Sequence, residues 1–417
     1  MHNEKKRILH APCQIIAASV FASLVLSLTA NAVGRLAFGG VSVLLLIVAI
    51  TGTYSRVTSS APERAAVLDW QGQRLGPRDA LRVYWVGHSL METQVETTEG
   101  PLRLLEMVGR MAEAQGLAYA MGDHTLWGAP LSLQWRGRPH AHKRYVPEQA
   151  ERRQRFATQA ASYDAIVLTE TIPLSAALKY EYSAYYLQQF YCTLMEANPA
   201  ARVYLYESWE PLQALDPDRS YPPPHLYDWR ARMVQDRLLW ERLADAASTA
   251  AIPPPGWFGR LPAVLRGGTP ACKVPAPIFI VPVGTAMVAL YDRLRAPRPE
   301  DDFSLPDGRR LAFTDLFRNP YIDWPAHWPI TAQTAQAVDT KAVIAALTLR
   351  DPAAEPDDIH PSPMGVYFAG LVHYATLYRR SPIGLPTFSE IGDALAGTLQ
   401  AIAWESVRND ARTGVQP

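Results

Sequence analysis

The stretch LRVYWVGHSL, residues 81–90, joins a run of apolar and aromatic residues to a glycine and a serine. Such a run is typical of a buried strand, and apolar side chains at helical spacing follow it from Pro101 to Gln115. Further strands are predicted at 164–169, 202–206 and 277–281, and further helices near 182–197, 228–250 and 285–294, with a last helix after Pro361. Apolar strands separated by helices predict the α/β class, with a parallel sheet covered on both faces.

The composition excludes several classes of protein. Among the 417 residues, 40 basic side chains balance 40 acidic ones, so the chain lacks the positive excess that sequence-independent nucleic-acid binding requires. We therefore expect no nucleic-acid partner. The three cysteines, Cys13, Cys192 and Cys272, are widely spaced, which excludes a disulfide framework and a zinc ribbon.

The N-terminal region is strongly apolar. Between Ile15 and Tyr54 the only charged residue is Arg35, and the stretches 15–32 and 36–53 each approach the roughly 20 residues that a helix needs to cross a bilayer. We therefore predict two transmembrane helices and attachment to a membrane, taken to be a bacterial inner membrane.

The charges around these stretches favour a cytoplasmic position for the rest of the chain. Lys5, Lys6 and Arg7 precede the first stretch, and two spans would return the chain to the side where it started. An alternative interpretation makes the first stretch a signal peptide that is cleaved at Ala30-Asn31-Ala32. With a single span, the large domain would lie on the other side of the membrane.

The sequence divides into four parts by composition. We expect a membrane segment at 1–54, a polar linker at 55–80, an α/β domain at 81–395 and a tail at 396–417. Three proline-rich stretches, 216–224, 253–277 and 296–306, are predicted to be long surface loops.

The segment Gly87-His88-Ser89-Leu90 directly follows the first predicted strand. Ligands of parallel α/β proteins bind at the carboxyl ends of the strands, so a serine there is accessible to a substrate. The nucleophile elbow of α/β-hydrolases is excluded because Met91 stands where that motif has a glycine. The alternative role for Ser89 is to cap a helix.

A second group of polar residues, Asp357-Asp358-Ile359-His360-Pro361, precedes an apolar helix. An acid three residues before a histidine, on a loop that opens a helix, can hold the imidazole by Nδ1 and leave Nε2 to take a proton from a serine. The alternative is a set of acids that complements the dipole of a helix N-terminus.

Together, Gly87-His88-Ser89-Leu90 and Asp357-x-x-His360 resemble blocks I and V of the SGNH, or GDSL-type, hydrolases. The resemblance implies a flavodoxin-like three-layer α/β/α domain and ester hydrolysis or acyl transfer. By position, Ser89 would be the nucleophile, His360 the general base and Asp357 the residue that orients it. Asp358 would be a neighbour of this triad.

The sequence departs from the family at three places. His88 replaces the aspartate of the family's first block. The oxyanion hole implied by the resemblance would use the backbone of Ser89 and of Gly128, with Gly122 in reserve. The asparagine of the third block is missing from Thr169-Glu170-Thr171, where the Thr171 hydroxyl is the candidate donor.

Three further features lie outside these blocks. Trp209 follows a predicted strand and is a candidate substrate platform, with a core aromatic as the alternative. His140 and His142 have the spacing of metal ligands but no nearby carboxylate, so no metal is predicted. The basic run from Arg136 to Arg155 is a solvated face or, beside a membrane, a contact for anionic headgroups.

These features predict a membrane-anchored serine esterase or acyltransferase that needs no cofactor. Its substrate would be an acyl ester of a small molecule or carbohydrate, with O-acetyl esters as one class by analogy with the family. The alternative, motivated by the missing asparagine, is a catalytically weak SGNH-like module that binds an acylated or glycan ligand.

Overall fold

The computed structural model describes residues 74–97, 100–212, 229–255, 272, 276–323, 347–387 and 391–416. The two predicted membrane spans and the alternative cleavage site lie outside the described residues, as do the first proline-rich stretch and most of the second. Within the described ranges, no helix is both long enough and apolar enough to cross a membrane.

The predicted α/β class with a parallel sheet is confirmed. Five parallel strands have the order β2-β1-β3-β4-β5, which is the order of flavodoxin-like folds. The strands are β1 (Ala80–Gly87), β2 (Ala118–Thr125), β3 (Ala165–Leu168), β4 (Arg202–Tyr206) and β5 (Ile278–Val281). The chain passes from β1 to β2 on one side and later to β3 on the other. This change of direction opens the crevice at the carboxyl ends of the strands where such folds bind ligands.

Alternating side chains of each strand build two separate cores. In β1, Val83 and Trp85 join one cluster of buried residues, while Tyr84 and Val86 join the other. Side chains two apart on a strand share a face, so a run that is apolar at every position fills both layers. The physical reason for the all-apolar strands is therefore burial from both sides.

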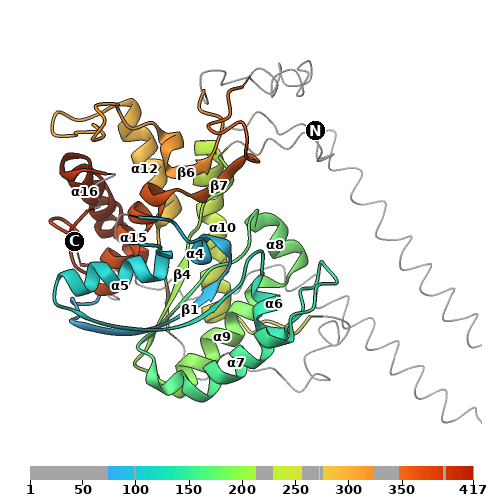
Figure 1. Ribbon diagram of the computed structural model, residues 1–417. Helices are drawn as coiled ribbons and strands as arrows, with labels where there is room; N and C mark the ends of the chain where they lie inside the picture. The colour runs from blue at the N-terminus through green and yellow to red at the C-terminus, as the bar shows by residue number, and fades with distance from the viewer. Residues whose placement is uncertain are drawn as a thin grey trace, which may run out of the picture. The chain divides into compact units, whose positions relative to one another are not determined.

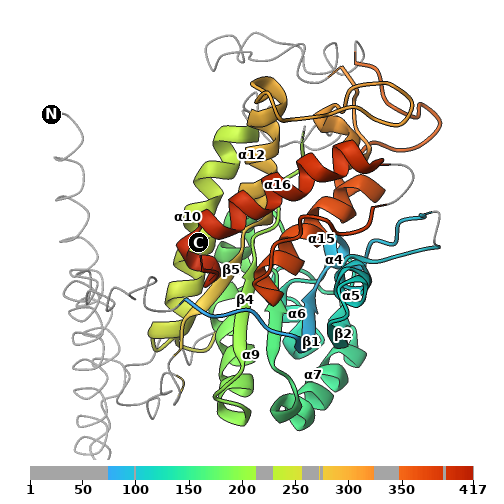
Figure 2. The same ribbon diagram turned by 90° about the vertical axis from the view of Figure 1, so that its left-hand side faces the viewer.

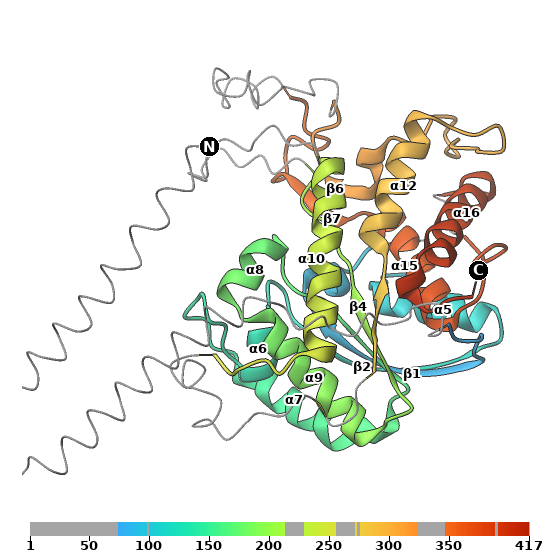
Figure 3. The ribbon, with the colours of Figure 1, turned by 180° about the vertical axis from the view of Figure 1, so that it is seen from behind.

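Helices cover both faces of the sheet (Figure 1). One layer contains α5 (Leu104–Ala114), α12 (Val283–Arg295), α15 (Pro363–Tyr378) and α16 (Asp393–Asn409). The other contains α6 (Leu131–Arg136), α7 (Pro147–Gln159), α9 (Ser183–Ala197) and most of α10 (Trp229–Thr249), with α8 (Leu174–Tyr180) beside it. Figure 2 shows α16 against α15, and Figure 3 shows α10 alongside α12. Short 3₁₀ turns occupy Ala160–Ser162, Phe313–Leu316 and Ala411–Thr413.

The C-terminal part differs from the prediction. The residues expected to form a tail from 396 belong to α16, whose side chains Leu399 and Ile402 are buried in the core. After this helix, Val415 pairs with Leu75, which was assigned to the linker. The domain therefore includes both segments, because the apolar face of α16 packs against α12 and α15.

A small two-stranded sheet holds the second group of polar residues. Strand β7 (Asp357–Pro361) pairs antiparallel with β6 (Phe317–Asn319), so Asp357 and His360 lie on a strand and not on a loop. The Asn319 side chain supports the approach to β7, since its amide donates to the Glu355 carbonyl at 2.9 Å. The Ser362 hydroxyl then caps α15 by accepting from the N–H of Gly365.

Candidate active site

Ser89 opens the short helix α4 (Ser89–Glu92) at the carboxyl end of β1. The glycine before it is required by close packing, because a Cβ at Gly87 would lie 2.6 Å from Met91 Sδ and 2.8 Å from Thr169 Cγ2. His88 occupies the cap position, and no side chain makes a cap hydrogen bond to α4. Ser89 is half-buried at the first helical position, so the capping role considered for it is not what the structure has.

His88 is a buried neighbour that supports the turn. Its Nε2 lies 2.9 Å from the carbonyl oxygen of Glu170, and since a carbonyl can only accept, Nε2 carries the proton. Burial lowers the pKa of His88 to about 4, with a further small lowering from His360. His88 is therefore neutral at physiological pH and links the serine turn to the end of β3.

Asp357 and His360 form the pair expected from their spacing. His360 Nδ1 lies 2.8 Å from Asp357 Oδ1, and the backbone N–H of His360 donates to the same oxygen at 3.0 Å. Burial opposes ionisation of Asp357, but the hydrogen bonds from His360 and the charge of Arg318 outweigh it and lower the pKa of the carboxyl. Asp357 is thus a carboxylate that holds the imidazole in one orientation, with Nε2 as the nitrogen left to accept a proton.

The serine turn and the histidine strand lie side by side. Helix α4 contacts β7. His360 is also close enough to His88 for its charge to lower the pKa of His88. Within the described part of the chain, no hydrogen bond joins Ser89 Oγ to His360 Nε2. Such bonds are often long in the absence of substrate and tighten only in the substrate complex.

Trp127 is a site residue that sequence reasoning missed as such. Its ring lies over the His360 ring at a centroid distance of 4.6 Å and an angle of 34°, and 44% of the residue is exposed. Arg144 holds this turn by donating to the Trp127 carbonyl at 2.8 Å. Trp127 therefore covers one face of the imidazole and presents apolar surface beside it.

The prediction that Trp209 is a substrate platform is wrong. It is fully buried, and its indole N–H donates to the carbonyl of Ile359 at 2.8 Å. Trp209 is therefore a core aromatic residue, because the segment that follows β4 turns into the interior beneath β7. Trp209 supports the strand that carries His360 and has no surface to offer a substrate.

The third-block region is organised by Glu170. This carboxyl is fully buried, and its Oε1 accepts from the Thr171 N–H at 2.8 Å, the Thr171 hydroxyl at 3.2 Å and the Leu131 N–H at 3.2 Å. Burial raises the pKa of Glu170 to about 7 in spite of these bonds. The Thr171 hydroxyl, the candidate oxyanion donor, is thus directed at Glu170.

The two candidate glycines occupy different environments. Gly128 lies in the turn after β2 with φ of 59°, next to Trp127, and this left-handed conformation favours glycine. Gly122 lies inside β2 opposite Tyr84, and a Cβ there would be 2.5 Å from the Tyr163 hydroxyl. Gly122 is therefore a packing glycine, and Gly128 is the one that follows Trp127, whose ring lies over the imidazole.

A groove of about 970 Å³ borders this site. Its lining includes Trp127 and Pro361, which neighbour His360 in space and in sequence, and the side chains of Arg103, Arg318 and Arg350. Arg103 is paired with Glu106 and Asp123, and Arg350 donates to backbone carbonyls and Asp315, whereas Arg318 is exposed. The groove combines an aromatic wall with charges of both signs, because Glu92 and Glu96 also line it.

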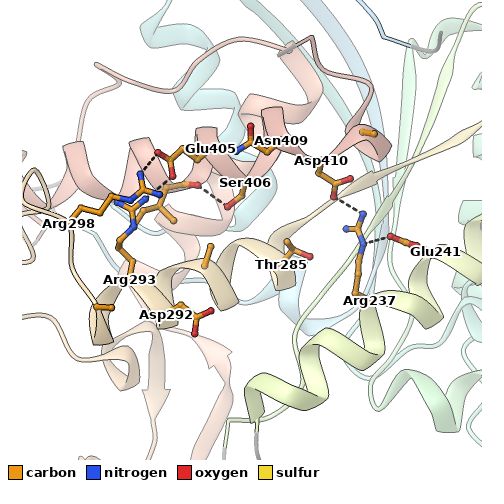
Figure 4. Close-up of a pocket in the computed structure, with 14 residues that line it drawn as sticks. Arg237, Glu241, Thr285, Asp292, Arg293, Arg298, Glu405, Ser406, Asn409 and Asp410 are labelled. Atoms are coloured by element: carbon orange, nitrogen blue, oxygen red, sulfur yellow. Dashed lines mark hydrogen bonds and ion pairs between the residues drawn. The ribbon is translucent and has the colours of Figure 1, made fainter. Parts of the chain in front are cut away.

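A second hollow, of about 750 Å³, lies between α10, α12 and α16 (Figure 4). Its arginines are already engaged: Arg237 pairs with Glu207, Glu241 and Asp410, while Arg293 and Arg298 both pair with Glu405. These ion pairs join the helices to one another. The hollow is thus a polar seam and does not border Ser89 or His360.

The histidines with metal-ligand spacing face cations. His140 Nε2 lies 2.7 Å from a guanidinium nitrogen of Arg136 and 2.8 Å from the hydroxyl of Tyr186. Burial and the charge of Arg136 lower the pKa of His140. In the described ranges, no cluster of three or more His, Cys, Asp or Glu side chains has the arrangement of a metal site.

No family model matches the chain, and no curated protein matches it. Among solved structures, the chain is similar to the crystal structure of a DUF4886 family protein from Bacteroides uniformis, with 16% sequence identity and a TM-score of 0.37. The match covers 79% of this chain and 95% of that chain.

Proposed function

We propose that the protein is a membrane-anchored serine esterase or acyltransferase of the SGNH type. The observation that carries the proposal is the 2.8 Å bond from His360 Nδ1 to Asp357, on a strand that contacts the helix opened by Ser89. An imidazole held in this way is a general base, and a half-buried serine beside it is the group such a base activates.

The reaction would follow the two-step course of serine hydrolases. Ser89 Oγ forms a bond to the acyl carbonyl carbon as His360 Nε2 takes the hydroxyl proton, and the same proton passes to the leaving alcohol when the ester C–O bond breaks. Water or an acceptor hydroxyl then attacks the acyl-serine and gives its proton to His360 Nε2. The same proton passes to Ser89 Oγ as the bond from Oγ to the acyl carbon breaks, which releases the acid or the new ester and restores the serine. Asp357 stabilises the imidazolium in both steps.

Oxyanion stabilisation would come mainly from the backbone. The N–H groups of Ser89 and Gly128 are the proposed donors, because Ser89 opens the helix that contacts β7 and Gly128 follows Trp127, whose ring lies over the imidazole. Thr171 would join them only by releasing its bond to Glu170. One missing donor lowers turnover about a hundredfold or more, so we expect a slow enzyme.

The groove supports an ester of a small molecule or carbohydrate as the substrate. Exposed tryptophan faces pack against the apolar faces of sugar rings, and Trp127 offers such a face beside the base. Arg318 adds an exposed guanidinium along the same groove. O-acetylated carbohydrate is therefore our first choice of substrate class.

A fluorophosphonate probe tests the proposal. We expect the full-length protein to be labelled on Ser89, and Ser89→Ala and His360→Ala to abolish labelling. Ser175→Ala is the matched control, because Ser175 is an exposed serine on α8. Folded wild-type protein that takes up no label would refute the esterase assignment.

The second candidate function is a binding module with little or no catalysis. It is favoured by the engagement of both Thr171 donors with Glu170, which leaves the oxyanion hole short of a side-chain donor. In that case the probe would not react, and O-acetylated oligosaccharide would bind in calorimetry with an affinity that Trp127→Ala reduces.

A further inference from the structure

The loop between α6 and α7 forms a strongly basic hollow away from the groove. The ten residues 136–145 contain four Lys or Arg and two His and no acidic residue. A cavity of about 490 Å³ is lined by Arg136, Arg138, Pro139, His140, His142 and Lys143. Every side chain of this lining except proline is cationic or can become so.

The positive charges of the loop are not neutralised by ion pairs. Among the residues that the structure describes, no carboxylate forms an ion pair with Arg136, Arg138, Lys143 or Arg144. The nearest acid, Glu181, is buried and holds the loop backbone, because its carboxylate accepts from the N–H groups of His140 and Ala141 at 2.7 Å each. The carboxylate of Glu181 thus shapes the loop backbone, while the side chains of Arg136, Arg138, Lys143 and Arg144 stay exposed to solvent.

Exposed aromatic rings surround the same loop. Tyr145, Tyr180 and Tyr182 are 61%, 53% and 44% exposed. The Arg138 guanidinium lies 5.4 Å from the Tyr145 ring centroid, and the Tyr182 ring meets His140 edge-on at 4.7 Å. Exposure of three large aromatic rings to water is unfavourable, whereas a membrane interface accommodates both aromatic rings and cationic side chains.

We propose that this basic-aromatic face, residues 136–145 with Lys179, Tyr180 and Tyr182, docks on the surface of an anionic lipid bilayer. The cations would contact phosphate headgroups, and the tyrosines would lie at the level of the headgroups. Charge complementarity supports a bilayer as the occupant, since basic clusters bind anionic lipids at about fivefold per charge. Twenty residues, 54–73, separate the second predicted span from the described domain, and a chain of that length reaches at most about 70 Å.

The docking face is connected to the candidate active site. Arg144, at the edge of the loop, donates to the carbonyl of Trp127, and Trp127 covers the His360 imidazole. A loop seated on the bilayer would hold the groove near lipid-linked or membrane-associated substrates. The docking itself does not rest on the proposed chemistry, and a Ser89→Ala protein is expected to dock like the wild type.

Amide hydrogen exchange of the full-length protein in nanodiscs tests this proposal. We expect peptides that cover 136–146 to exchange at least about tenfold more slowly in discs with phosphatidylglycerol than in pure phosphatidylcholine discs, and salt near about 0.5 M to remove the difference. The variant Arg138→Glu/Lys143→Glu should lose more than about a hundredfold in docking affinity and with it the protection. The matched control Arg242→Glu/Arg408→Glu, at two exposed arginines outside the loop, should keep it.

Three outcomes would overturn the proposal. The first is equal exchange of the loop in neutral and anionic discs. The second is protection by inorganic phosphate in neutral discs, which would assign the hollow to a soluble anion. The third is equal loss of protection in the loop variant and in the control variant. Exchange in the peptides of β1 and β3 reports whether each variant is folded, so misfolding cannot imitate any of these results.

Discussion

Replacing Asp357 by asparagine is the sharpest test of the candidate site. One carboxylate oxygen accepts both the Nδ1–H and the backbone N–H of His360, at 2.8 and 3.0 Å. If the amide oxygen takes that place, both bonds persist but the charge is lost. A charge-assisted bond contributes about 1 to 1.5 kcal/mol more than a neutral one, so turnover falls at least about tenfold.

The loss is larger if the amide presents its NH₂ group to the ring. The imidazole then carries its proton on Nε2 and cannot take one from Ser89, and in a serine protease the corresponding change lowers turnover about 10⁴-fold. We therefore expect Asp357→Asn to lower kcat/KM for p-nitrophenyl acetate by about 10 to 10⁴, or roughly 1.4 to 5.5 kcal/mol.

Asp358→Asn is the matched control, since it alters the neighbouring carboxyl by the same chemistry. We expect it to change kcat/KM by less than about threefold, because no step of the proposed mechanism uses it. Thermal unfolding of both variants checks the fold. Equal losses at the two aspartates, or an active Asp357→Asn enzyme, would refute the assigned role.

Three further outcomes are expected. Because the pKa of Glu170 is raised to about 7 from 4.5, its ionisation in the folded state costs stability as pH rises from about 4.5 to 7, so Glu170→Gln should recover up to about 3 kcal/mol at pH 8 relative to pH 5. Urea unfolding at the two pH values measures this, and an unchanged pH difference contradicts it. Trp127→Ala should lower kcat/KM with little change in stability, whereas Trp209→Ala should cost about 3 to 5 kcal/mol in denaturant unfolding; the opposite pattern would reverse the two roles. A reporter fused after Pro417 should be active in the cytoplasm and one fused after Gly34 only when exported, and export of the full-length fusion would leave a single span.

Strands β3 and β5 can be predicted from the sequence because their side chains are buried on both faces of the sheet. Residues 165–168 and 278–281 are apolar at every position, which leaves little alternative to a strand. The edge strand β2 could not be predicted from the sequence, because most of its side chains are at least partly exposed and its end carries Asp123 and His124. The exposure of β2 leaves its sequence mixed in polarity, whereas β5 at the other edge is buried throughout and apolar.

The candidate site is predictable only where its parts are close in sequence. Asp357 and His360 are three residues apart, so local spacing is enough to pair them. The contact of Trp127 with His360 joins distant parts of the chain, and no local pattern distinguishes it from any exposed tryptophan. The role of Glu170 depends on its complete burial, which a sequence of polar residues after a strand does not reveal.

Hydrogen bonds connect the strand that bears His360 to the segment that follows β4 of the main sheet. The indole N–H of Trp209 bonds to the carbonyl of Ile359, and the N–H of Leu212 bonds to the carbonyl of Asp358 at 3.0 Å. The segment that follows β4 thus fixes the position of β7 through two hydrogen bonds. A change in the length of the connection between β6 and β7 can then leave the position of the His360 imidazole unchanged. A substitution of buried Trp209, in contrast, would displace the imidazole although Trp209 does not touch the substrate.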